Sequence, residues 1–112
     1  MKLAALGLVA LASIVAAPSH AGSVTSFVTR VYVRQHDGLV YFDTTGPINN
    51  RAACGLSNNT WIIPNENTET SKRQYAALLA AKAANLQVDV YGSGACTRWA
   101  DSEDVDTIVI RD

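Results

Sequence analysis

The chain has 112 residues, 48% of them hydrophobic, and nine Lys and Arg residues stand against ten Asp and Glu residues. This length allows one compact domain and is too short for two. A mildly acidic chain without a glycine-rich phosphate loop is a poor partner for phosphate backbones, so nucleic-acid binding is disfavoured.

Residues 1–21 have the three-part pattern of a secretory signal peptide. Lys2 gives a positive start, residues 3–17 form an apolar run, and small residues stand at positions −3 and −1 of a cut after Ala21. The run of about fifteen residues is shorter than the roughly 20 that a membrane-spanning helix needs. We therefore expect a secreted or periplasmic bacterial protein with no membrane span, whose residues 22–112 form a single domain of net charge −2.

Cys54 and Cys96 are the two cysteines of the chain. In the oxidising compartment that export implies, an even cysteine count predicts a disulfide. A bridge between them closes a loop of roughly 43 residues, which is worth about 4 kcal/mol in the chain-entropy model. Two free thiols or a bridge between chains remain as alternatives.

The residue pattern after the signal predicts three strands, a helix and two strands. Strands are expected over residues 24–35, 39–44, 86–91 and 105–110, with an interrupted third strand over 51–56 and 60–63. Asp37-Gly38 marks a tight turn between the first two. Residues 96–99 are either a short strand or a structured loop. The first strand is expected to alternate between a buried and a solvent face: Phe27, Val31 and Val33 on one, and Arg30, Tyr32 and Arg34 on the other.

The one helix is expected over residues 68–84. Thr68 or Thr70 can cap its start, its last turns are rich in alanine, and Asn85 is a plausible left-handed stop. Five strands with a helix between the third and fourth give the element order of the OB-fold, a small closed barrel. An open α+β sheet with the helix on one face is the alternative.

Catalysis and metal binding are not indicated by the residues present. His36, the only histidine after the signal, lies beside a turn, and nothing positions it as a general base. An acidic cluster near the C-terminus has calcium-binding residue types but not the spacing of an EF-hand loop. We interpret it as a solvated loop that leads into a strand; its members are Asp101, Glu103, Asp104 and Asp106. We expect no enzyme activity, no metal and no cofactor.

The two tryptophans receive different interpretations. Trp61 stands beside Ile62 and Ile63 and is expected in the core. Trp99 lies between Arg98 and Asp101 in a loop that the disulfide would anchor. An aromatic face next to a hydrogen-bond donor and an acceptor is what sugar recognition needs. The alternative is that Trp99 plugs one end of the barrel. A second polar and aromatic surface, or simply a solvated strand face, is expected from Arg30, Tyr32, Arg34 and Tyr41.

Several of these features occur in one known family. They are an exported chain of this size, a hairpin ending near Tyr41-Phe42, Cys54, the stretch Ser57-Asn58-Asn59, Trp61, a helix, a strand and Cys96. The layout resembles the receptor-binding B subunit of subtilase cytotoxin and its small secreted relatives. The resemblance implies an OB-fold, a pentameric ring, and binding of sialylated glycans on behalf of a toxin A-type subunit. It also points to Ser26, with Ser23 as a rival, as a residue of the sugar pocket.

We therefore expect a secreted, non-enzymatic binding module with a glycan or glycoprotein ligand. The proposed ligand residues are Trp99, Arg98, Asp101 and Ser26. The alternative is a secreted structural or protein-interaction protein, such as an envelope component or an inhibitor, without a glycan ligand.

Overall fold

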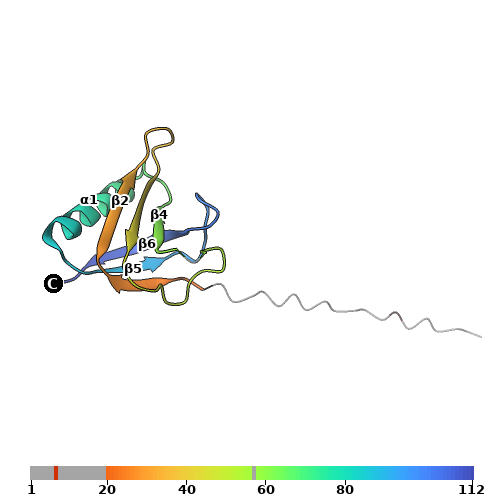
Figure 1. Cartoon of the computed structure of the whole chain (residues 1–112). Coiled ribbons are helices and arrows are strands. Elements are labelled where there is room, and N and C mark those ends of the chain that lie inside the picture. The colour runs from red at the N-terminus through yellow and green to blue at the C-terminus, as the bar shows by residue number, and fades with distance from the viewer. Residues whose placement is uncertain (1–6, 8–19, 57) are drawn as a thin grey trace, which may run out of the picture.

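A computed structural model describes residue 7, residues 20–56 and residues 58–112 (Figure 1). Most of the expected signal peptide therefore lies outside the described residues. The fold is mainly β with one helix, as the sequence predicts. Its elements are β1 (Ser23–Ser26), β2 (Val28–Val33), β3 (Val40–Thr44), β4 (Thr60–Ile63), α1 (Glu69–Ala84), β5 (Val88–Gly92) and β6 (Glu103–Ile110). Over the described ranges, no helix is long and apolar enough to cross a membrane.

The strands form one six-stranded mixed sheet in the order β1-β5-β6-β4-β3-β2. Neighbours are antiparallel except β4 and β6, which run parallel. The sheet is not closed into a barrel, which differs from the expected closed barrel and is nearer to the open-sheet alternative. No pairing joins its edge strands β1 and β2 in the described part of the chain, although only Phe27 separates them in sequence. β2 continues the chain almost directly from β1, and the two strands are not hydrogen-bonded neighbours in the sheet.

The expected first strand is thus two strands, and its predicted alternation is wrong in part. Phe27 and Val33 are exposed, whereas Val28 is buried and Val31 packs against the core. The pairing of β2 with β3 shifts register between Val28 and Arg30. An extra residue at a bulge reverses which face the following side chains take. A steady alternation along residues 24–35 therefore could not hold.

The first half of the expected third strand is a loop, because residues 51–56 pair with no strand. The Arg51 guanidinium donates hydrogen bonds to the carbonyl groups of Leu56 and Asn58, which folds this segment back on itself. Residues 96–99 are also a loop and not a strand. The predicted disulfide joins these two loops: Cys54 is bonded to Cys96, with Cα atoms 6.1 Å apart.

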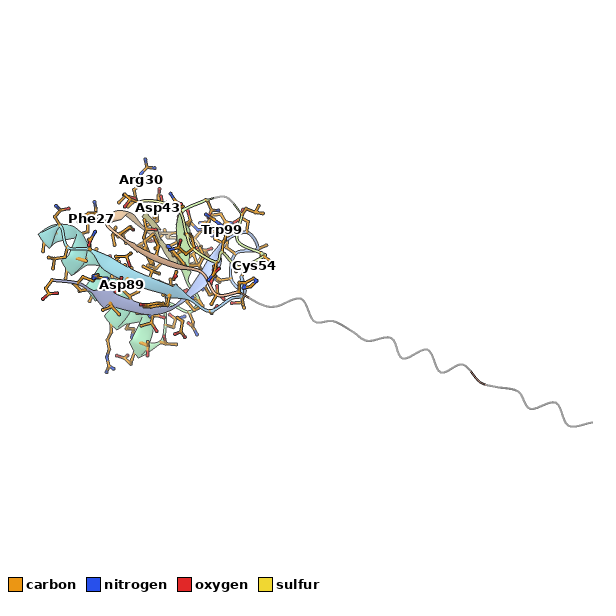
Figure 2. The ribbon with its side chains drawn as sticks, turned by 90° about the horizontal axis from the view of Figure 1, so that it is seen from below. Phe27, Arg30, Asp43, Cys54, Asp89 and Trp99 are labelled. Carbon is orange, nitrogen blue, oxygen red and sulfur yellow. A yellow bond between two sulfur atoms is a disulfide. The ribbon has the colours of Figure 1, made fainter. Side chains whose placement is uncertain are left out.

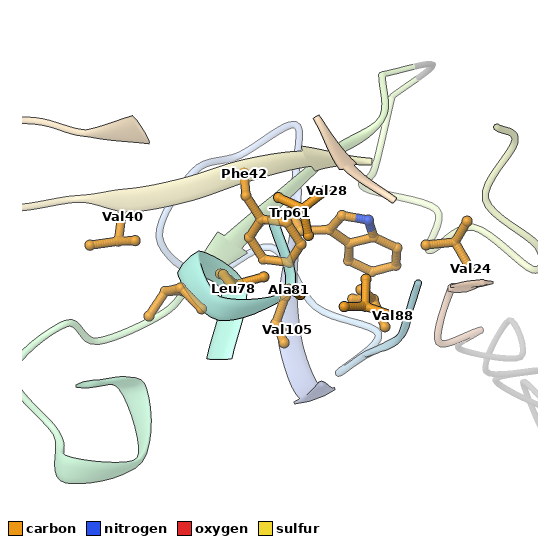
Figure 3. Packing of buried hydrophobic residues seen from close by; sticks show 11 residues of the cluster. Val24, Val28, Val40, Phe42, Trp61, Leu78, Ala81, Val88 and Val105 are labelled. Carbon is orange, nitrogen blue, oxygen red and sulfur yellow. The ribbon is translucent and has the colours of Figure 1, made fainter. Parts of the chain in front are cut away.

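The helix begins and ends as the sequence predicts. The Thr68 hydroxyl accepts a hydrogen bond from the Ser71 amide at 3.1 Å, and Asn85 takes the left-handed conformation with φ of 52°. Leu78 and Ala81 place one side of the helix against the inner face of the sheet, where Phe42 and Trp61 lie fully buried (Figure 3). Trp61 is therefore a core residue, and its indole N–H donates to Thr44 Oγ1 at 3.1 Å.

Candidate ligand-binding face

The loop of residues 93–102, between β5 and β6, lies against the outer face of β3 and β4. Ile62 alternates with the core residues Trp61 and Ile63, so its side chain points to the outer face, yet it is fully buried. The Arg98 side chain of this loop reaches the Pro64 carbonyl just beyond β4, and Trp99 contacts Tyr41 of β3. We infer that this loop is what covers Ile62. Its side chains consequently join the outer surface of the sheet.

A row of three aromatic rings crosses this surface. Tyr32 and Tyr41 are paired residues of β2 and β3, and their rings stack with centroids 4.2 Å apart and planes 8° apart. Trp99 meets Tyr41 edge-on at 5.4 Å. The Arg34 guanidinium lies over the Trp99 ring, 4.8 Å from its centroid. All three rings are partly exposed. Thus the loop tryptophan and the strand tyrosines, which the sequence suggested as two surfaces, form one.

A polar hollow of about 490 Å³ adjoins this row. The residues that line it are Thr29, Arg30, Asp43, Thr44, Asn58, Asn59 and Thr60. Tyr32 connects the row to the hollow, because its hydroxyl accepts from Arg30 at 3.3 Å and donates to Asp43 Oδ2 at 3.1 Å. The other Asp43 oxygen accepts from the Thr60 hydroxyl at 2.7 Å. Figure 2 shows Arg30 and Asp43 close together.

Sequence reasoning missed most of this hollow. Asp43 shares the outward parity of Tyr41 in β3, between the buried residues Phe42 and Thr44. This alternation was the signal that could have placed it beside the tyrosines. Asn58, Asn59 and Thr60 carried no comparable signal, because their position depends on how the loop before β4 folds.

Arg98 is next to Trp99 in the chain but is engaged elsewhere. Its guanidinium pairs with the Glu66 carboxylate at 2.5 and 3.2 Å and donates to the Asp37 carbonyl at 3.0 Å. The hydrogen bond from Arg98 is the main reason that the pKa of Glu66 lies below its usual range, and the same contact raises the pKa of Arg98. This arrangement ties the loop to the β2–β3 turn and to the segment after β4. We therefore infer that Arg98 helps to hold Trp99 in position.

Over the described residues, the side chains of Asp101 and Ser26 form no hydrogen bond with the three rings, and Asp101 is linked through Ser102 to Asn58 of the hollow. The Asp101 carboxylate accepts from the neighbouring Ser102 hydroxyl at 3.1 Å, and its carbonyl accepts from the Leu56 amide at 2.9 Å. Ser26 is buried in β1, only 5% exposed. Among the four expected ligand residues, only Trp99 presents a side chain to the aromatic row.

The turn between β2 and β3 carries the main ion pair of this face. Arg34 and Asp37 pair at 2.5 Å, and the Asp37 carboxylate also accepts from the Leu39 amide at 3.1 Å. These contacts, the Arg34 hydrogen bond above all, lower the pKa of Asp37 to about 2. At neutral pH the pair is therefore fully charged. Arg34 is held between Asp37 and Trp99, so the row of rings ends at a fixed cation.

Comparison with known proteins gives no relative for this chain: no family model, no curated protein and no solved structure matches it.

Proposed function

We propose that the chain is exported, cleaved after Ala21, and acts as a non-enzymatic module that binds a glycan on the face built by β2, β3, β4 and loop 93–102. The observation that carries this proposal is the contact of Trp99 with the Tyr41–Tyr32 stack beside the polar hollow. Sugars present an apolar ring face and a rim of hydroxyl groups. A partly exposed aromatic row next to donors and acceptors complements both.

The chemistry of the hollow fits hydroxyl recognition. Arg30 is exposed, supplies donors, and forms no ion pair within the described part of the chain. The Asp43 carboxylate supplies acceptors, and the amides of Asn58 and Asn59 supply both. Asp43 is oriented by two side-chain hydroxyl groups, so its position is set before a ligand arrives. Preorganised polar groups lose less conformational entropy on binding.

The topology supports the same face. We propose that the domain is related to the OB-fold, with β1 and β2 as one interrupted first strand and without hydrogen-bonded closure. In OB-folds, oligosaccharides and oligonucleotides bind across strands 2 and 3 and the loops that follow strands 1 and 4. The corresponding parts here are β3, β4, the turn of residues 34–39 and loop 93–102. The aromatic row and the hollow lie on these parts together with β2 and the loop before β4.

The resemblance to toxin B subunits adds proposals about partners. Sialylated glycans are the first ligands to test, and a toxin A-type subunit is the corresponding protein partner. We also propose a homo-oligomer, with a pentamer as the form that the resemblance implies. The exposed part of the alanine-rich helix surface offers a flat area for such contacts, around Ala76, Ala80, Ala83 and Ala84. The disulfide suggests a location outside the cytoplasm.

The proposed function is tested by screening purified chain 22–112 against an array of sialylated and neutral glycans, followed by calorimetric titration of the best ligand. Trp99→Ala and Tyr41→Ala are each expected to weaken binding roughly five- to 150-fold, by analogy with the roughly 1–3 kcal/mol of aromatic stacking on bases. Asp43→Asn tests the hollow. Tyr91→Ala removes an exposed aromatic residue of β5 and should leave affinity unchanged, which makes it the matched control.

Three results would overturn the glycan proposal. The first is no saturable binding on the array. The second is unchanged affinity in a folded Trp99→Ala protein, which would move the site elsewhere. The third is binding of a single-stranded oligonucleotide in place of a glycan. If Trp99→Ala unfolds, the glycan affinities of the Tyr41→Ala and Asp43→Asn variants test the proposal instead. Asp43→Asn preserves the shape of the side chain, so it should fold.

A further inference from the structure

Glu103 is a buried carboxylate at the start of β6, on the inner side of the sheet. It is 3% exposed. Both of its oxygens accept from the Gly22 amide, at 3.1 and 3.0 Å, and further hydrogen bonds come from the amides of Ala52 at 3.3 Å and Gly94 at 2.9 Å. Three segments distant in sequence thus direct backbone N–H groups at one side chain. The interpretation of Glu103 as part of a solvated acidic loop is therefore wrong, and it is also wrong for Asp104, which is likewise 3% exposed.

The charge of Glu103 has no counter-charge in the described part of the chain. The ion pairs found there involve Asp37, Glu66, Glu69 and Asp89, and none involves Glu103. Backbone amides solvate a buried carboxylate only partly, and an unpaired buried charge is costly. A cation at this position would lower that cost, and none of the described residues forms an ion pair there.

The Glu103 carboxylate occupies the space that a side chain on Gly92 or Gly22 would take. A Cβ on Gly92 would lie 1.7 Å from Glu103 Oε2, and a Cβ on Gly22 would lie 2.7 Å from Oε1 and 2.9 Å from the Ile48 side chain. Neither distance is compatible with any larger residue unless the carboxylate moves. Because neither glycine has a side chain, the backbone nitrogen of Gly22 can lie within hydrogen-bond distance of the Glu103 carboxylate.

Gly22 is held in place by groups on its C-terminal side. Its carbonyl accepts from the Gly92 amide at 2.8 Å, and the next residue, Ser23, exchanges two hydrogen bonds with Asn49 at 2.9 and 2.8 Å. Gly22 is buried, whereas His20 and Ala21 are exposed. Removing the residues before Gly22 breaks none of these contacts, so its nitrogen would stay beside Glu103.

We propose that Glu103 is a receptor site for the N-terminus created by signal-peptide removal. Hydrolysis of the Ala21–Gly22 bond consumes one water, leaves a carboxylate on Ala21 and an amine on Gly22, and this amine is protonated at neutral pH. The amide that donated to Glu103 thereby becomes an ammonium at the same place, and a buried ion pair forms. Processing then stabilises the mature fold. This inference depends on cleavage after Ala21 and is independent of any glycan ligand.

The test compares two N-termini in a thermodynamic cycle. One protein begins at Gly22, and the other carries the single extra residue Ala21, which restores an amide at Gly22 and moves the ammonium outward. Each is made with Glu103 and with Glu103→Gln. With Glu103, the extra residue should lower the folding equilibrium constant at least about tenfold, measured by urea unfolding. With Glu103→Gln, the extra residue should no longer lower the folding equilibrium constant, because a buried ammonium without a counter-charge gains nothing over an amide.

A second measurement avoids the Glu103 variant, in case that variant does not fold. The rate of acylation of the N-terminal amine should be at least about tenfold lower in the chain that begins at Gly22 than in the chain that begins at Ala21, because a buried, paired ammonium reacts slowly. Equal acylation rates, equal stabilities of the two forms with Glu103, or an exported protein whose N-terminus by mass spectrometry is not Gly22 would overturn the proposal.

Discussion

Adjacent acidic residues in this chain serve different purposes because strand side chains alternate between faces. Glu103 points inward and accepts backbone amides from three segments. Asp104 points outward, and one of its oxygens accepts from both the amide and the hydroxyl of Thr97, at 3.1 and 2.5 Å, within loop 93–102. One carboxylate thus organises the inner end of the sheet and the other shapes the loop that carries Trp99.

The pKa of Asp37 provides a prediction at the scale of single residues. It is lowered to about 2, first by the hydrogen bond from Arg34. A carboxyl group whose pKa is lower in the folded state stabilises the fold above its unfolded pKa, about 3.9, and this stability is lost as the pH falls toward 2. Carboxyl NMR titration should give a pKa near 2 for Asp37, and Arg34→Gln should raise it toward 3.9. A wild-type value near 3.9 would contradict the ion pair.

At the scale of elements, loop 93–102 is positioned by several tethers of different kinds. The disulfide fixes Cys96, the Leu56 amide holds the Asp101 carbonyl, and the Arg98–Glu66 pair fastens the middle of the loop beside the β2–β3 turn. The Arg98 and Glu66 side chains are 26% and 18% exposed, so solvent screens the attraction between them only in part. Trp99 is therefore placed against Tyr41 by contacts that it does not make itself.

Glu66→Gln tests this positioning role. The loss of charge weakens the bond to Arg98, so loop 93–102 should become more mobile and glycan affinity should fall by up to about fivefold, the usual range for one partly exposed pair. Backbone hydrogen exchange should accelerate in the loop but not in α1. Glu69→Gln, which removes the exposed partner of Lys72 on the helix, is the matched control. Unchanged exchange in the loop would show that the other tethers suffice.

At the scale of the whole molecule, one disulfide links two loops that precede β4 and β6, the parallel pair of the sheet. These strands are adjacent in the sheet although the helix and β5 separate them in sequence. A covalent bond between their leading loops limits how far that non-local pairing can open. It also connects the segment that precedes Asn58, one of the residues lining the hollow, to the loop that carries Trp99.

Replacing both cysteines, as Cys54→Ser with Cys96→Ser, should cost about 4 kcal/mol of unfolding free energy in the chain-entropy model. For a domain of this size, that is a large share of the usual stability. Urea unfolding of the oxidised wild type, the reduced wild type and the double variant measures it. The reduced wild type should resemble the double variant. A wild type that is equally stable with and without reductant would contradict this expectation.

The sequence alone determined the features that depend on neighbouring residues or on composition. The helix bounds follow from the Thr68 cap, the alanine-rich interior and the Asn85 stop, and the Asp37-Gly38 turn from local backbone preference. The disulfide was predicted from an even cysteine count together with the expected export signal, and the structure contains it. Trp61 was recognisable as core because two isoleucines follow it. The aromatic residues of the candidate face were identified, but as two separate surfaces.

Only the tertiary structure decided how those pieces meet. The bulge near Thr29 reverses the facing of β2, and the parallel pairing of β4 with β6 sets where loop 93–102 begins and ends, so Trp99 reaches Tyr41. The same pairing places Glu103 beside Gly22, which is 81 positions earlier in the chain. Such contacts depend on strand register and on packing between distant segments. Local propensity carries no information about either, so no pattern within a few residues of Glu103 distinguishes it from a solvated acid.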